Sequence, residues 1–268
     1  MTFYMTLKDY LKKAQKQKFA IGQFNFSTLE QLRGILAAAK KMKSPVILGT
    51  SEGESKFLGL EEILALVEIS KMKYKVSAFL NLDHGKDLDY IKKAIDFGYS
   101  AVHFDSSDLS LEKNMKYAKK VVEYAHKKGV LVEGELEGIE KENLSSLNEV
   151  KRFVKETKVD SLAIAIGSRH GLYRDVKLNF NRLKEINSKV DTFLVLHGGS
   201  GISNVQIRKA IKFGIVKINI NTELRLAWKR TLAKSLKAQE IKPYKILPKV
   251  QKAVQKKVGE KLKVFKNE

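Results

Sequence analysis

Three of the five histidines in this 268-residue chain lie at the end of a largely apolar run and are followed directly by glycine. They are His84, His170 and His197. If the three runs are strands that end at one rim of a barrel, the imidazoles meet there. Three protein nitrogens and one open position make the ligand set of a catalytic zinc ion. The pattern therefore predicts a three-histidine metal site, although any one of them alone would read as a hydrogen-bonded rim residue.

The segment 130-VLVEGELEG-138 places Glu133, Glu135 and Glu137 at alternate positions. In a strand, alternate side chains share one face. Carboxylates on a buried face need a cation or a proton, because an unpaired buried charge is costly. We expect at least Glu135 to face the metal. For Glu133 the alternative is a bond to a lysine such as Lys217, and for Glu137 it is a place in the following loop.

Two aspartates accompany the predicted metal ligands. Asp83 precedes His84, and Asp105 ends another apolar run. Carboxylates beside a metal are candidates for proton transfer, with shifted pKa values. Adjacent strand residues point to opposite faces, so Asp83 and His84 serve one site only where the strand is ending. For Asp105 the alternative is a helix cap or an Asx turn before a helix that begins near residue 110.

The other two histidines are interpreted as structural. His126 falls in the last turn of a predicted helix, where a cation suits the helix dipole. His103 lies inside a strand two residues before Asp105, so both side chains point the same way. A place beside the metal ligands is the alternative for His103, but we interpret it as a core histidine with satisfied hydrogen bonds.

The stretch 193-FLVLHGGSG-201 continues from a strand into a glycine-rich turn. Loops after the seventh and eighth strands of a barrel commonly form a phosphate site with the N-terminus of a helix. Glycine allows backbone N–H groups to approach an anion closely, and a serine adds a hydroxyl. The predicted phosphate-binding residues are Gly198, Gly199 and Ser200 after the seventh strand, and Asn219, Asn221 and Thr222 at the end of the eighth.

Eight apolar, β-rich runs recur along the chain, with amphipathic helical patterns between them. The runs are 19-FAIGQFNF, 45-PVILGTS, 76-VSAFLNLDH, 100-SAVHFD, 130-VLVEGELEG, 161-SLAIAIGSRH, 193-FLVLHGG and 215-IVKININT. Because parallel neighbours need crossover helices, this alternation predicts a parallel sheet. Eight units in roughly 240 residues fit an α/β fold with a closed (β/α)8 TIM barrel. An open doubly wound sheet is the alternative, and the lack of a G-x-G-x-x-G turn after the first run weakens it.

The ends of the predicted helices are marked as well. Gly98, Gly129 and Gly214 each close a helical pattern just before a strand, which is the expected C-terminal signal. Beyond the eighth strand, residues 223–237 read as the eighth helix. Residues 243–265 then predict one extra, basic C-terminal helix that caps the barrel or contacts another subunit.

The composition narrows the function classes. The chain has no cysteine, so disulfides and thiolate catalysis are excluded and a transition metal must be held by His, Asp or Glu. No run of 18 apolar residues and no signal-peptide pattern occurs, so we expect a soluble cytoplasmic protein with no membrane partner. The net charge of +21 is spread along the chain without a nucleic-acid-binding motif, so we predict a solvated lysine-rich surface and no nucleic-acid partner.

Several motifs together resemble the class II, zinc-dependent fructose- and tagatose-bisphosphate aldolases. They are 80-LNLDHG-85, 130-VLVEGELEG-138, 162-LAIAIGSRHGLY-173, 194-LVLHGGSG-201 and 216-VKININT-222. The first two βα units and the C-terminal helix are also similar to that family. The resemblance covers nearly the whole chain and implies a single aldolase domain over residues 1–268, with a C-terminal helical extension from about residue 239.

The resemblance assigns roles to individual residues. His84, His170 and His197 hold the catalytic zinc, Glu135 and Asp105 lie near an alternative or second divalent position, and Asp83 handles the proton of the 4-hydroxyl. Gly171 joins the phosphate-binding residues above, with Na⁺ or K⁺ nearby, and Ser51 lies at the other phosphate. Asn25 is included in the predicted substrate-binding set. Members of the family are homodimers or homotetramers.

One loop departs from the family pattern. Residues 135-ELEGIEKENLSS replace a longer, more glycine-rich loop that supplies the mobile carboxylate for protonation of carbon. Glu140 and Glu142 are the candidates for that role in this chain. In the tail, 242-KPYK stands where Asp-Pro-Arg is common, so no arginine for the second phosphate is evident.

The predicted reaction is reversible cleavage of a ketose 1,6-bisphosphate, foremost fructose 1,6-bisphosphate, to dihydroxyacetone phosphate and glyceraldehyde 3-phosphate. A metal bound to the ketone and its neighbouring hydroxyl spreads the carbanion charge into an enediolate. Tagatose bisphosphate or another ketose phosphate is an alternative substrate. A Schiff-base lyase that uses Lys217 and a non-catalytic polyanion-binding barrel are alternatives from other classes.

Overall fold

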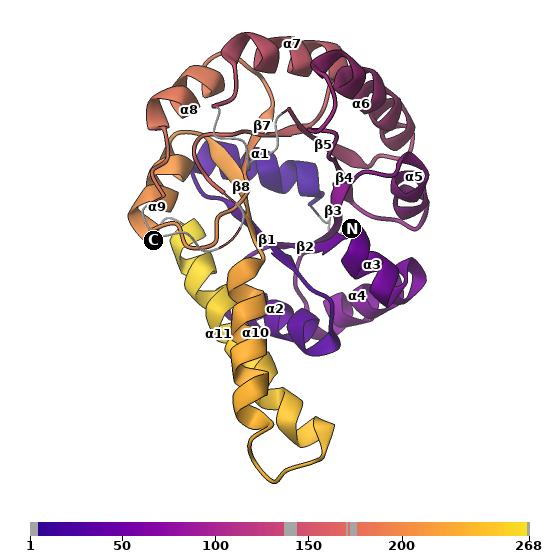
Figure 1. The fold of residues 1–268 in the computed structure, drawn as a ribbon, viewed down its shortest axis with the longest axis vertical. Helices are drawn as coiled ribbons and strands as arrows, with labels where there is room; N and C mark the ends of the chain where they lie inside the picture. The colour runs from indigo at the N-terminus through magenta and orange to yellow at the C-terminus, as the bar shows by residue number, and fades with distance from the viewer. Residues whose placement is uncertain (1–4, 137–143, 170, 172–175, 267–268) are drawn as a thin grey trace.

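The computed structural model describes residues 5–136, 144–169, 171 and 176–266. Its eight strands are parallel and close into one barrel in chain order, with helices around the outside (Figure 1). The strands are β1 (Ile21–Asn25), β2 (Val46–Ser51), β3 (Ala78–Gly85), β4 (Ala101–Phe104), β5 (Leu131–Glu135), β6 (Ser161–Ala163), β7 (Phe193–Leu196) and β8 (Ile215–Ile220). The predicted TIM barrel is confirmed, and the open sheet is wrong because β1 pairs with β8.

Helices follow the strands as predicted, and a further helix, α1, precedes β1. They are α1 (Leu7–Gln17), α2 (Leu29–Met42), α3 (Glu52–Leu58), α4 (Leu60–Tyr74), α5 (Leu88–Asp96), α6 (Leu111–His126), α7 (Leu147–Thr157), α8 (Phe180–Asn187), α9 (Asn204–Lys212), α10 (Thr222–Ser235) and α11 (Pro243–Phe265). Gly98, Gly129 and Gly214 have positive φ angles of 92°, 70° and 116° between a helix and the next strand. The predicted helix over 243–265 forms with those bounds.

Two apolar clusters hold the barrel together. The larger one lies between the strands and the outer helices and includes Phe24, Leu48 and Leu82, all buried. The smaller one closes the N-terminal end of the barrel, where Leu7 and Leu11 of α1 pack with strand residues such as Ile47. Because the strand N-termini are plugged in this way, the open end is the one where the strands finish.

Strand β6 is much shorter than the apolar run that predicted it. It ends at Ala163, although the apolar run continues to Ile166. Ile164 and Ile166 are nevertheless fully buried. An apolar run in the sequence indicates that residues are buried, not that they pair in a sheet. Here the chain leaves the sheet after Ala163, while its side chains still pack in the core.

Strand β3 ends irregularly, and the irregularity places two functional side chains together. The β3–β4 register shifts between Leu82 and Gly85. Within this bulge His84 has a φ of 52°, in the left-handed region that residues other than glycine rarely adopt. The regular alternation of side chains is broken at this point, so consecutive residues of β3 can both face the barrel mouth.

The last two helices extend beyond the barrel. In Figure 1, α10 and the start of α11 form a hairpin that projects from one side, and the rest of α11 returns to pack along α2. Leu236, Ile241 and Tyr244, at and near its tip, are 60%, 86% and 69% exposed. In the part of the chain that is described, no helix is long and apolar enough to cross a membrane.

Candidate metal centre and active site

Four side chains that can ligate a metal meet at the mouth of the barrel. They are His84 from β3, His103 from β4, Glu135 from β5 and His197, which directly follows β7. Each offers one ligand atom, and these atoms all lie within 4.8 Å of one another. His170 lies outside the described residues, so its predicted place beside His84 and His197 stays a prediction. The expectation that His84, His197 and Glu135 converge agrees with this geometry.

The donor atoms in this cluster fit a divalent cation. The Oε2 atom of Glu135 lies 3.2 Å from His103 Nε2, 3.7 Å from His197 Nδ1 and 3.9 Å from His84 Nδ1. Among the described atoms, Glu135 Oε2 is buried without a hydrogen-bond partner. Buried polar atoms are almost always satisfied, and a carboxylate oxygen has several lone pairs, so this oxygen marks a place for a missing group. Imidazole and carboxylate donors suit zinc and related transition metals.

His197 is held from behind by a buried ion pair. Its Nε2 lies 2.7 Å from Glu133 Oε1, and the other oxygen of Glu133 lies 2.5 Å from Lys217 Nζ. Burial raises the pKa of Glu133, but Lys217 and His197 lower it by more, so this carboxyl stays ionised. Burial also lowers the pKa of His197. A neutral imidazole that donates Nε2–H to Glu133 leaves its Nδ1 lone pair facing Glu135, as a metal ligand requires.

The ion pair between Glu133 and Lys217 bears on the predictions made for each of these residues. Glu133 does bind Lys217, which was the alternative to a place beside the metal. Lys217 does face the barrel interior, but its ammonium group is buried and pairs with Glu133. A Schiff-base nucleophile must be a neutral amine that reaches the substrate. The structure therefore argues against a Schiff-base role for Lys217.

Asp105 contacts a ligand rather than joining the cluster. Its Oδ2 lies 2.7 Å from His84 Nδ1, and its Oδ1 accepts from the hydroxyl and the backbone N–H of Ser107. Burial lowers the pKa of His84, but Asp83, Asp105 and Glu135 raise it to about 9. In this structure Asp105 orients His84, and a direct role at a second metal position stays a prediction.

Asp83 is placed as an ionised base. It is buried, and its carboxylate accepts from Asn25 Nδ2 at 2.9 Å and from Asn219 Nδ2 at 3.2 Å. Burial raises its pKa, but nearby imidazoles, foremost that of His84, lower it well below the usual range. Asn25 also donates to Glu54 and is fully buried. Asn25 therefore positions Asp83. It is not in the lining of the cavity beside this cluster, and its predicted role in substrate binding stays a prediction.

A cavity of about 250 Å³ opens beside this cluster. It is lined by Ser51, Asp83, His84, Gly171, Gly198, Ser200, Asn219, Asn221, Thr222 and Arg225. All but Arg225 belong to the predicted set. The predicted Gly199 is absent from the lining, and its N–H donates to the carbonyl of Asn219. Helix α10 begins at the cavity with Thr222, and a helix N-terminus attracts anions.

Arg225 was not predicted. It lies in the first turn of α10, its side chain is 58% exposed, and its guanidinium donates to Glu54 Oε1 at 2.6 Å. The signal was present in 223-ELRLAWK, directly after the predicted phosphate residues, but nothing local shows which face of a helix turns toward a cavity.

Glu137, Glu140 and Glu142 lie outside the described residues, so the predictions for these three glutamates stay predictions.

The two remaining histidines differ from each other. His126 is in the last turn of α6 and bonds Asp160, which agrees with a structural role. His103 is not a core residue away from the site, because its Nε2 faces the metal cluster, 3.2 Å from Glu135 Oε2, which agrees with the alternative of a place beside the metal ligands. That interpretation is corrected: strand alternation placed His103 on the inner face, but only the closed barrel shows what that face meets.

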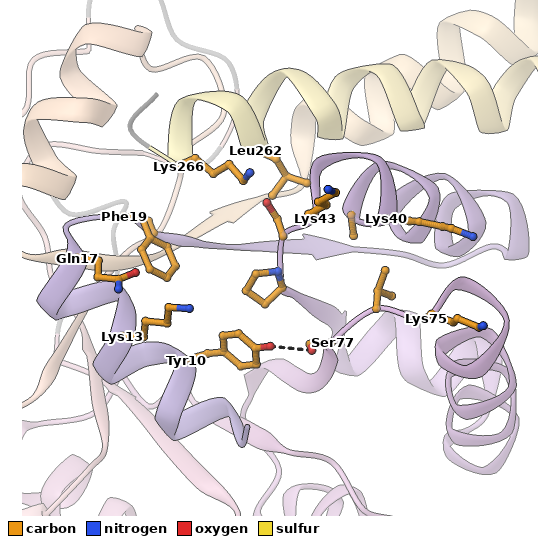
Figure 2. Close-up of a pocket in the computed structure, with 15 residues that line it drawn as sticks. Tyr10, Lys13, Gln17, Phe19, Lys40, Lys43, Lys75, Ser77, Leu262 and Lys266 are labelled. Atoms are coloured by element: carbon orange, nitrogen blue, oxygen red, sulfur yellow. Dashed lines mark hydrogen bonds between the residues drawn. The ribbon is translucent and has the colours of Figure 1, made fainter. Parts of the chain in front are cut away.

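A second, larger cavity of about 580 Å³ lies at the opposite end of the barrel (Figure 2). Five lysines line it, from α1, the ends of α2 and α4, and the end of α11: Lys13, Lys40, Lys43, Lys75 and Lys266. Most of them stand at helix C-termini, where positive charge suits the helix dipole. No described residue of this lining carries a carboxylate or an imidazole. Its described lining therefore offers no carboxylate or imidazole to ligate a metal, unlike the smaller cavity.

Comparison with known proteins agrees with this geometry. The sequence profile of the family described as "Fructose-bisphosphate aldolase class-II" matches residues 5–268. The chain is 38% identical over 276 residues to the 6-phospho-5-dehydro-2-deoxy-D-gluconate aldolase of Shouchella clausii, covering 98% of this chain and 94% of that one. It is 39% identical over 245 residues to the fructose-bisphosphate aldolase of Geobacillus stearothermophilus, covering 87% and 85%.

A solved structure shows the same architecture. The YdjI aldolase from Escherichia coli K12 superposes with a TM-score of 0.88 at 32% identity, covering 97% of this chain and 96% of that one. The match extends over the whole barrel and the C-terminal helices, as the sequence resemblance implied. The chain therefore belongs to the class II fructose-bisphosphate aldolase family, whose members are carbon–carbon lyases.

Proposed function

We propose that this protein is a zinc-dependent aldolase that reversibly cleaves a ketose bisphosphate, foremost fructose 1,6-bisphosphate, with one catalytic domain over residues 1–268. The observation that carries the proposal is the meeting of His84, Glu135 and His197 beside a cavity that ends on a helix N-terminus. A metal site alone would suit many enzymes. A metal site next to an anion site suits a reaction on a phosphorylated ketone.

His84 and His197 would hold the ion together with His170, with Glu135 as a further ligand. When bound, a divalent cation supplies a Lewis acid that stabilises negative charge next to a ketone. Asp83 would take the proton from the hydroxyl of the carbon that becomes the aldehyde. It is suited to do so, because two asparagines fix its carboxylate and its lowered pKa keeps it ionised. The return of a proton to carbon by Glu140 or Glu142 stays a prediction.

The phosphate next to the ketone would bind where α10 begins, against Gly198, Ser200 and Thr222. The far end of the substrate would meet Ser51 and Arg225, which line the same cavity. A guanidinium group binds a phosphate or a carboxylate through two parallel hydrogen bonds. Arg225 would thus supply the arginine for the second anionic group that was not evident in the tail.

The names of two relatives indicate which substrates to compare. One is named for a 6-phospho-5-dehydro sugar acid and one for fructose bisphosphate. Both names describe a phosphate on the carbon beside the ketone, and the far ends differ: a carboxylate in one and a phosphate in the other. Because Arg225 can bind either anion, fructose bisphosphate, tagatose bisphosphate and the sugar acid are the three substrates to compare.

A coupled assay that measures dihydroxyacetone phosphate tests the proposal. The three substrates are supplied to enzyme as purified, to enzyme stripped with EDTA and to stripped enzyme with added Zn²⁺. We expect cleavage that EDTA abolishes and zinc restores. Full activity after removal of all divalent ions, or trapping of the substrate on the protein by borohydride, would contradict the proposal.

We also propose a homodimer or homotetramer. The exposed apolar residues at and near the tip of the α10–α11 hairpin support this, because the hairpin itself projects away from the barrel (Figure 1). Light scattering after size exclusion gives the mass directly. A monomer at micromolar concentration would contradict the proposal.

A further inference from the structure

The metal cluster contains His103 beside His84, Glu135 and His197. The role of His103 differs from that of the other three side chains. It is fully buried on β4, and its ring centre lies 4.6 Å from that of His84 and 4.8 Å from that of His197. Proximity alone would make it a metal ligand. The hydrogen bonds of its ring decide otherwise.

One ring nitrogen of His103, Nδ1, already accepts a hydrogen bond. The backbone N–H of His84 donates to His103 Nδ1 at 3.1 Å. A neutral imidazole has one nitrogen with a lone pair and one with a proton. Because Nδ1 uses its lone pair for His84, the proton of neutral His103 is on Nε2. A protonated ring nitrogen has no lone pair to offer, so His103 in this tautomer cannot bind a metal through the atom that faces the cluster.

That proton has a single fitting partner within the cluster. His103 Nε2 lies 3.2 Å from Glu135 Oε2, which is donor–acceptor distance, and among the described residues neither atom has another hydrogen-bond partner. Leaving two buried polar groups unsatisfied is unfavourable, so the contact is favoured.

We propose that His103 is a positioning residue that donates Nε2–H to Glu135 and so orients this carboxylate toward the metal. On the opposite side it accepts from the His84 N–H and stabilises the left-handed conformation that brings His84 to the barrel mouth. One imidazole thus connects two ligands without being a ligand. This inference rests on the proposed metal site.

The test compares two substitutions of His103. In His103→Gln, an amide N–H can still reach Glu135, whereas the amide nitrogen has no lone pair for a metal. In His103→Met, the space is filled and the donor is lost. Zinc affinity is measured by competition with a chromophoric chelator, and the ligand set by the visible absorption of Co²⁺-loaded protein. His126→Gln, which changes a histidine remote from the cluster, is the matched control, and the melting temperature of each variant reports folding.

We expect His103→Met to weaken zinc binding about 10- to 100-fold, as loss of an outer-shell partner does, and His103→Gln to stay within a few-fold of the unmodified protein. The Co²⁺ spectrum should keep its band positions in His103→Gln. Equal losses in both variants with an altered Co²⁺ spectrum would show that His103 is a ligand, and His103→Met with unchanged affinity would show that it only fills space. Either result overturns the inference.

These outcomes separate this inference from the proposed function. If the unmodified protein binds no divalent ion tightly, the metal site itself fails. If it binds zinc and cleaves substrate but His103→Met matches the control, only the role of His103 fails. Affinity and spectrum are both measured without substrate, so a loss of turnover from other causes does not enter.

Discussion

The buried pair of Glu133 and Lys217 gives the most quantitative prediction. Lys217→Met removes the ammonium group that lies 2.5 Å from Glu133 Oε2 and fills its space with an apolar chain of similar length. Both side chains are about 95% buried or more, so water cannot take over the lost contact. Breaking one partner of a buried pair costs about 3–5 kcal/mol, because the other charge is left without compensation. We expect the free energy of unfolding to fall by that amount at neutral pH.

The pH dependence of this loss follows from the pKa of Glu133. In the folded protein the pKa is lowered, so the stabilisation is complete above the pKa of the unfolded chain and disappears as pH falls toward the folded pKa. The difference between Lys217→Met and the unmodified protein should therefore be full at pH 7 and shrink below about pH 4.3, the ordinary pKa of glutamate. Urea denaturation of EDTA-treated protein measures it without a contribution from metal binding.

The double variant Lys217→Met/Glu133→Gln serves as the control. A glutamine keeps a neutral acceptor near His197 and removes the buried charge, so this variant should regain most of the lost stability. A loss below about 1 kcal/mol in Lys217→Met, typical of exposed ion pairs, would refute the reasoning. So would a double variant that is no more stable than Lys217→Met.

Three further predictions test the site itself. Asp83→Asn should lower kcat by about 10²- to 10⁴-fold with an unchanged zinc content, since the base is removed and no ligand is; steady-state kinetics and metal analysis check this. Arg225→Gln should raise KM for substrates with an anionic far end about ten- to hundredfold, the loss of a charged hydrogen bond of about 1.5–3 kcal/mol, whereas Arg230→Gln, on the same helix and outside the cavity lining, should not. Gly198→Ala should lower the melting temperature, because Gly198 has a φ of 62° and an added Cβ would lie 2.4 Å from the Arg169 carbonyl oxygen.

The sequence was sufficient for the fold because the relevant signals are periodic and local. Alternating apolar runs and helices, with glycine at helix ends, predicted eight strands and the extra helix over 243–265. The rule that barrel strands end at one rim then brought together residues as distant as His84, Glu135 and His197. These inferences need only the chain order and the direction of each strand.

The exact positions and partners of the site residues could not be predicted from the sequence. They depend on irregular strand ends and on contacts between residues that are distant in the chain. The bulge at His84 turns consecutive residues of β3 to one mouth, and no local pattern announces it. The hydrogen bond from Asn25 to Asp83 was not predicted, since strand position gives the face of a side chain but not its partner. Arg225 enters the cavity only because α10 begins at that rim with one particular rotation.

By itself, then, the sequence determined the barrel, the family and the gathering of imidazoles at its open end, since these follow from short-range patterns and the direction of parallel strands. Only the tertiary structure decided the division of roles within the cluster. Whether His103 binds an ion or orients Glu135, and whether Lys217 is a nucleophile or a counter-ion, depends on which nitrogen carries a proton and which carboxylate lies within hydrogen-bonding distance of it. Those contacts join β4 to its sheet neighbour β3, and β8 to the non-adjacent strand β5, and they form only in the folded barrel.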